Sequence, residues 1–95
     1  MKLVWTTRAK NDLREIVTRI WHDDPGAAIR MRTRIETTAA YLKLQPWMGR
    51  QGAIAGTREA IPHPSYRMVY KVKGETVSIL TIVHTSRRWP PGEEA

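Results

Sequence analysis

The feature that most constrains the fold is a pair of apolar stripes at helical spacing, separated by the dipeptide Asp24-Pro25. Aspartate is favoured as a helix N-cap and proline at the first helical position, so the dipeptide predicts that one helix ends here and another begins. Two helices joined by so short a connection must fold back on each other as an antiparallel hairpin. The first stripe comprises Ala9, Leu13, Ile16, Val17, Ile20 and Trp21, and the second comprises Ala28, Met31, Ile35, Ala39 and Leu42.

The rest of the chain is patterned for strands. Lys2–Trp5 is short and apolar enough for an edge strand, and Gln45–Gly56 is rich in glycine and contains a proline, which predicts a loop. Thr57–Ile61 and Tyr66–Val72 alternate, whereas Thr76–His84 is β-branched and apolar on both faces, which predicts the central strand. The expected order is β-α-α-β-β-β. This predicts an α+β fold with a helical hairpin on one face of a small antiparallel sheet.

Length and charge narrow the class of protein. Ninety-five residues suffice for one domain, so we expect a single domain over residues 1–95, with about 91–95 as a frayed tail. Sixteen Lys and Arg against nine Asp and Glu give a net charge of +7, and eleven of the cations are arginine. Such an excess attracts nucleic acid, a phosphate-rich site or an acidic protein. Arginine favours bidentate recognition of phosphate or carboxylate. Between the apolar positions of the first helix, Arg8, Lys10, Arg14 and Arg19 are predicted to face solvent.

Several classes of site are disfavoured. The chain has no cysteine, which excludes disulfides and thiolate metal ligands, and its three histidines are too dispersed for a metal-ligand pair. No phosphate-binding glycine loop is present, so neither a metal nor a cofactor is expected. No apolar run approaches the ~20 residues that span a bilayer, so we expect no membrane association and a cytoplasmic location.

Three blocks of sequence, in this order, resemble the RelE/ParE toxin superfamily. The first is Trp5–Leu13, which reads WTTRAKNDL. The second combines Gly56–Glu59 (GTRE) with Tyr66–Val72 (YRMVYKV). The third is Val77–His84 (VSILTIVH), followed by Arg87-Arg88-Trp89-Pro90. Each block is a weak match alone, but the combination in so short a chain is specific.

The resemblance implies the toxin of a type II toxin–antitoxin system, which inhibits growth, can stabilise plasmids, and is neutralised by a cognate antitoxin that wraps its surface. The superfamily divides by target. RelE-like members cut mRNA in the ribosomal A site, whereas ParE-like members bind DNA gyrase and block replication without known chemistry of their own.

A RelE-like ribonuclease needs no metal, but it does need a base, an acid, and cations to hold the charge of the phosphorane. In that case the resemblance implies catalytic roles for Arg67, Arg87 and Arg58, with Arg50 adding charge nearby. His84 ends the last strand and is a proton carrier suited to neutral pH. Its alternative role is that of a strand-end histidine hydrogen-bonded to the chain.

Two departures from the RelE-like pattern favour the ParE branch. RelE-like enzymes present lysines before the middle strand, and Gln45–Ile61 contains none. Where these enzymes carry a C-terminal tyrosine, this chain has Trp89-Pro90, and an indole cannot act as an acid or base. The favoured interpretation is therefore a gyrase inhibitor that is not an enzyme, and the alternative is a ribosome-dependent mRNA interferase.

Under the ParE interpretation, Arg87, Arg88 and Trp89 contact the target, because desolvated Arg and Trp are frequent interface anchors. The alternative is that Trp89 folds onto the sheet beside two solvated arginines. Arg58 and Arg67 are assigned to the antitoxin interface. A third hypothesis is a basic nucleic-acid-binding module, although the cations are spread over both helices and the sheet. The other three tryptophans, Trp5, Trp21 and Trp47, are expected to pack in the core or against the loop.

Overall fold

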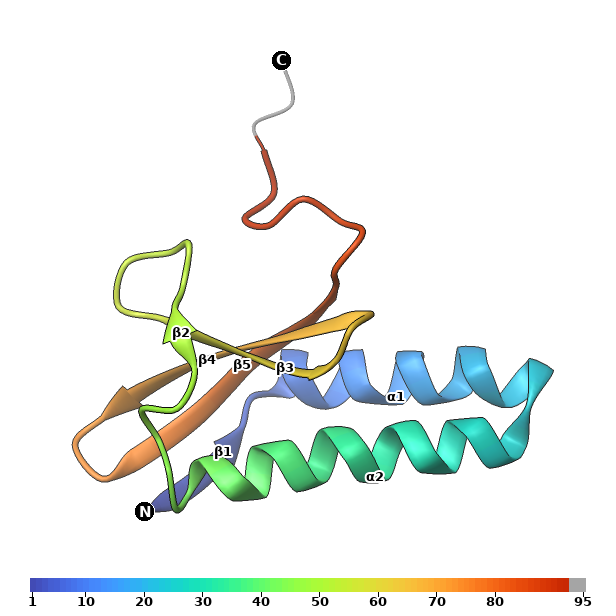
Figure 1. Ribbon diagram of the computed structural model, residues 1–95, viewed down its shortest axis with the longest axis horizontal. Coiled ribbons are helices and arrows are strands. Elements are labelled where there is room, and N and C mark those ends of the chain that lie inside the picture. Colours follow the sequence, from blue (N-terminus) through green and yellow to red (C-terminus); the bar gives the residue numbers. More distant parts are fainter. Residues whose placement is uncertain (93–95) are drawn as a thin grey trace.

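The computed structural model describes residues 1–92, in which two helices lie on one side of a five-stranded sheet (Figure 1). The last three residues of the predicted frayed tail lie outside the described residues. The elements in chain order are β1 (Lys2–Trp5), α1 (Thr7–Asp23), α2 (Pro25–Leu42), β2 (Arg50–Gln51), β3 (Arg58–His63), β4 (Tyr66–Lys73) and β5 (Thr76–His84).

The helical hairpin is confirmed, and its boundaries follow from side-chain caps. The Thr6 side chain accepts a hydrogen bond from the backbone N–H of Ala9 at the start of α1. Asp24 caps α2 by accepting from the Ala27 N–H at 3.1 Å, and Pro25 occupies the first turn. Each cap satisfies a backbone donor that has no partner within its helix.

Neither α1 nor α2, the helices of the described residues, has the length and apolar character of a membrane-spanning segment.

The sheet is mixed, which corrects the prediction of an antiparallel one. The strand order is β1-β5-β4-β3-β2; β1 runs parallel to β5, and the other neighbours are antiparallel. The central strand is β4, not the predicted Thr76–His84. An apolar pattern on both faces of a strand indicates that the strand has neighbours on both sides, but not that it is the middle one. β5 fits this pattern because it lies between β1 and β4. The short β2 forms within the predicted loop and pairs with the first two residues of β3.

The core lies between the hairpin and the sheet. Ile16 of α1 and Ile35 of α2 are 5% and 0% exposed and pack with Met68 and Tyr70 of β4 and Ile79 of β5. The tryptophan expectation is correct for Trp5, which packs partly buried against this core. It is wrong for Trp21, which is half exposed.

Replacing either core isoleucine, Ile16 or Ile35, by alanine should lower the free energy of unfolding by about 2–4 kcal/mol, because each change leaves a cavity in a packed interior. Chemical denaturation of the purified variants measures this loss. Ile29→Ala is the matched control, since Ile29 lies on α2 and is 57% exposed. Losses below ~0.5 kcal/mol at both core positions would contradict the packing described above.

Candidate functional site

A buried carboxylate, that of Glu59 on β3, organises one group of the predicted site residues. Glu59 is 4% exposed, and its Oε1 lies 3.2 Å from Arg50 Nη2 and 3.3 Å from Arg67 Nε. Its Oε2 accepts a hydrogen bond from the backbone N–H of Ala53 at 3.0 Å. The Arg67 contact is an ion pair without hydrogen-bond geometry. One carboxylate therefore holds two arginines and the loop that follows β2.

Arg58, the neighbour of Glu59 along β3, is held by the preceding loop. Its Nη1 donates to the carbonyl oxygens of Trp47 and Gly49, and its guanidinium lies 5.0 Å from the centre of the Trp47 ring. Trp47 thus packs against Arg58 through a cation–π contact, as expected for a residue of this loop, although 61% of it remains exposed. The Arg58 cation thus has internal partners of its own.

Tyr70 of β4 fastens the same loop from the core. Its hydroxyl donates to the carbonyl of Pro46 at 2.8 Å and accepts from the N–H of Gly49 at 3.0 Å. Burial raises the pKa of the Tyr70 hydroxyl, against the opposing effects of the Gly49 hydrogen bond and of the Arg58 charge. A Cβ at position 49 would lie 2.5 Å from that hydroxyl oxygen, so the close approach requires glycine.

His84 ends β5 in contacts with its own neighbours. Its ring meets the Tyr66 ring edge-on, with the centroids 5.3 Å apart. Its Nδ1 accepts from the backbone N–H of Ser86 at 3.0 Å and lies 2.6 Å from the Ser86 hydroxyl oxygen. These contacts agree with the strand-end alternative, and they fix the ring where the chain leaves the sheet.

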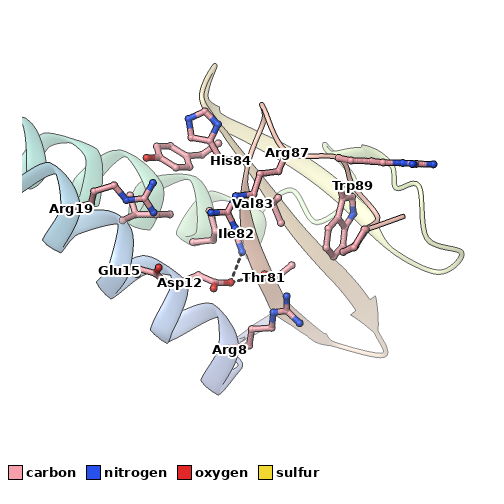
Figure 2. Close-up of a pocket in the computed structure, with 14 residues that line it drawn as sticks. Arg8, Asp12, Glu15, Arg19, Thr81, Ile82, Val83, His84, Arg87 and Trp89 are labelled. Atoms are coloured by element: carbon pink, nitrogen blue, oxygen red, sulfur yellow. Dashed lines mark hydrogen bonds between the residues drawn. The ribbon is translucent and has the colours of Figure 1, made fainter. Parts of the chain in front are cut away.

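The remaining predicted residues line a cleft between α1 and the segment that follows β5 (Figure 2). The cleft has a volume of about 150 Å³. Arg87 and Arg88 are exposed, and Trp89 is partly buried, with its indole Nε1 buried and without a hydrogen-bond partner among the described residues. His84 contributes to the same wall. The structure therefore brings His84, Arg87, Arg88 and Trp89 together, whereas neither Arg58 nor Arg67 lines this cleft.

The opposite wall is a stripe of α1 that contains two arginines predicted to face solvent, Arg8 and Arg19, and two carboxylates for which no role was predicted. Arg8, Asp12, Glu15 and Arg19 all line the cleft (Figure 2). Their spacing of four, three and four residues places them on one face of a helix, and this was the signal available in the sequence. Asp12 also ties α1 to β5: its Oδ2 accepts from the Thr81 hydroxyl and, at 3.0 Å, from the N–H of Ile82.

Within residues 1–92, no three side chains of His, Cys, Asp or Glu gather as they would around a metal ion. What the cleft offers is guanidinium groups and aromatic rings beside two carboxylates. Such a surface can bind an anionic or acidic group.

Comparison with known proteins identifies the family. The family described as "ParE toxin of type II toxin-antitoxin system, parDE" matches residues 3–89. A putative toxin, Y4kP of Sinorhizobium fredii, is 39% identical over 90 residues, which cover 94% of this chain and 93% of that protein. Toxin RelE2 of Caulobacter vibrioides is 40% identical over 86 residues, covering 90% and 97% of the two chains. A solved structure of the chromosomal ParDE system from P. aeruginosa superposes with a TM-score of 0.80 at 25% identity, covering 88% of this chain and 95% of that one.

Proposed function

The chain belongs to the ParE toxin family of type II toxin–antitoxin systems, and on that premise we propose that it is a ParE-like inhibitor of DNA gyrase, acting in the cytoplasm and neutralised by a cognate antitoxin. In this proposal the protein performs no chemistry and needs no cofactor. It acts by binding, through Arg87, Arg88 and Trp89.

The observation that carries the proposal is the state of the other arginines. A ribonuclease of this superfamily needs free cations to stabilise the phosphorane. Here Arg67 and Arg50 share the Glu59 carboxylate, and Arg58 is bound to backbone carbonyls. A cation already paired with a buried carboxylate stabilises an incoming phosphate less, because the two negative charges compete for it. This supports a binding role over RNA cleavage.

The exposed residues of the segment after β5 also support the proposal of a binding role. Arg87 and Arg88 are exposed and, among the described residues, have no carboxylate within ion-pair distance. Trp89 beside them presents an apolar ring at the cleft. Arginine and tryptophan in such a setting are typical anchors of protein interfaces.

A ribosome-dependent interferase remains the second candidate, and one arrangement favours it. His84, Tyr66 and Arg87 line the same cleft, so a proton carrier and a cation lie together. The 40% identity to the protein named toxin RelE2 points in the same direction.

Antitoxin binding is the other half of the proposal. The similar P. aeruginosa structure is described as a ParDE system, which pairs toxin and antitoxin. We assign Arg58 and Arg67 to this interface. Arg67 keeps 18% of its side chain exposed, so it can contribute to a contact while remaining paired with Glu59.

The proposal predicts the outcome of two assays on the purified protein. It should inhibit gyrase-catalysed supercoiling of a relaxed plasmid, and it should leave mRNA on translating ribosomes uncut. His84→Ala should still inhibit supercoiling, because the proposed contact is made by Arg87, Arg88 and Trp89 and no catalytic step depends on His84. Cleavage of ribosome-bound mRNA that is lost in His84→Ala or Arg67→Ala would instead establish the interferase.

A further inference from the structure

We infer that the cleft between α1 and the segment after β5 is a carboxylate-binding site, in which Arg8 and Arg19 of α1 act together with Arg87 and Arg88 to bind acidic side chains of the target protein. The inference deepens the proposed function, since it rests on Arg87–Trp89 as the target contact and gives that contact a second wall. It adds two binding residues and a chemical class for the ligand.

The charge balance of the cleft calls for an anion. Its lining contains four arginines against two carboxylates, Asp12 and Glu15. Asp12 is already engaged by the Thr81 hydroxyl and the Ile82 N–H. None of the four arginines has a carboxylate within 4.0 Å among residues 1–92. Four guanidinium forks around one cleft therefore have donors to spare, and a carboxylate matches their bidentate geometry.

The helix spacing places two distant cations on the same wall of the cleft. Arg8 and Arg19 are separated by three turns of α1, so they lie on the same face of the helix, with Asp12 and Glu15 between them. The Asp12 bonds to β5 hold that face against the strand from which Arg87 and Arg88 follow. The two pairs of arginines are thus presented from two elements joined by direct hydrogen bonds.

The size and composition of the cleft favour a protein side chain over nucleic acid. Its volume of about 150 Å³ is well below the ~300–1,000 Å³ of pockets that enclose small-molecule ligands. A glutamate or aspartate side chain needs far less room than a nucleotide. Asp12 and Glu15 in the lining repel the closely spaced charges of a phosphate backbone more than single carboxylates, and a peptide can also offer N–H donors to them.

The first test uses an oligoglutamate peptide as the probe, with oligoglutamine as the uncharged comparison, and measures binding by calorimetry. The unmodified protein should bind oligoglutamate in preference to oligoglutamine. Arg8→Ala/Arg19→Ala should weaken oligoglutamate binding by about tenfold or more. The matched control is Arg14→Ala/Arg30→Ala, which removes the same charge from exposed helix positions outside the cleft and should change binding by less than about twofold.

The second test measures growth arrest and inhibition of supercoiling for the same two variants. Arg8→Ala/Arg19→Ala should lose both effects, and the control pair should keep them. Equal oligoglutamate binding by the two variants, or full toxicity of Arg8→Ala/Arg19→Ala, would overturn the inference. So would retention of duplex DNA or RNA by the protein in a gel-shift assay that depends on Arg8 and Arg19, since the ligand would then be phosphate.

Failure of the proposed function is a separate result. If the unmodified protein does not inhibit gyrase, the gyrase proposal is wrong, yet the peptide comparison still decides the cleft. Unchanged melting temperatures and antitoxin binding establish that both variants are folded. We expect unchanged melting temperatures because the four substituted arginines, Arg8, Arg19, Arg14 and Arg30, are exposed and make no ion pair among the described residues.

Discussion

Glu59→Ala is expected to destabilise the protein by about 3–5 kcal/mol, a large part of the stability of a domain of this size. Deleting the carboxylate leaves Arg67, whose Nε is buried, without its counter-ion. It also removes the acceptor of the Ala53 N–H and one partner of Arg50. Removing one partner of a buried ion pair lowers the free energy of unfolding by more than the intact pair contributes to it, because the remaining charge is desolvated and unpaired.

Urea denaturation of Glu59→Ala measures this loss, and the chain supplies a matched control in Glu36→Ala. Glu36 pairs with Arg32 on the surface of α2, where the side chains are 50% and 61% exposed. That change should stay within about 0.5 kcal/mol, because exposed pairs contribute little. Glu59→Gln should lie between the two, since its amide oxygen can still accept from Ala53. A loss below ~1 kcal/mol for Glu59→Ala would mean that Arg50 and Arg67 are effectively free, which would remove the main support for a binding role.

The helical hairpin was predictable because its determinants are local. Asp24 and Pro25 determine the helix boundary within one turn of chain. The 3.6-residue period of each helix determines which side chains face the core, Ile16 in α1 and Ile35 in α2. The order of the strands was not. The parallel partner of Lys2 is Thr76, across nearly the whole chain, and no local pattern records which strand edge it will choose. The two-residue β2 is likewise defined by its pairing with β3 and not by its own sequence.

In the candidate site, too, features set by neighbouring residues were predictable and features set by strand pairing were not. The sequence predicted that Arg87, Arg88 and Trp89 act together because they are adjacent. It did not predict that Glu59 would take up Arg50 and Arg67, because this depends on cross-strand register: Glu59 pairs with Arg50 on one side and with Val69 on the other. The spacing of Arg8 and Arg19 with Asp12 and Glu15 places all four on one face of α1. The sequence does not show that this face lies opposite the segment after β5 and forms a cleft with it.

Truncation after Ser86 is expected to abolish toxicity while leaving a folded protein that still binds antitoxin. The cut removes Arg87, Arg88 and Trp89, and therefore one wall of the cleft. The end of β5 is anchored before that point, because the Thr85 N–H donates to the carbonyl of Ser65 and the Thr85 hydroxyl donates to that of Pro64. The core residues all precede the cut as well. Folding should thus survive the loss of the contact segment.

Charge alone cannot explain the expected loss of toxicity. The removed residues carry two arginines and two glutamates, so the formal net charge is the same before and after truncation. The full-length variant Arg87→Ala/Arg88→Ala/Trp89→Ala separates the three side chains from the length of the chain. Desolvated Arg and Trp anchors often contribute about 2 kcal/mol or more each, so this variant should bind gyrase more than about a hundredfold more weakly. Growth arrest, antitoxin binding and gyrase binding are measured on both forms. A truncated protein that still arrests growth would place the target contact elsewhere, and one that loses antitoxin binding would show that the segment serves both partners.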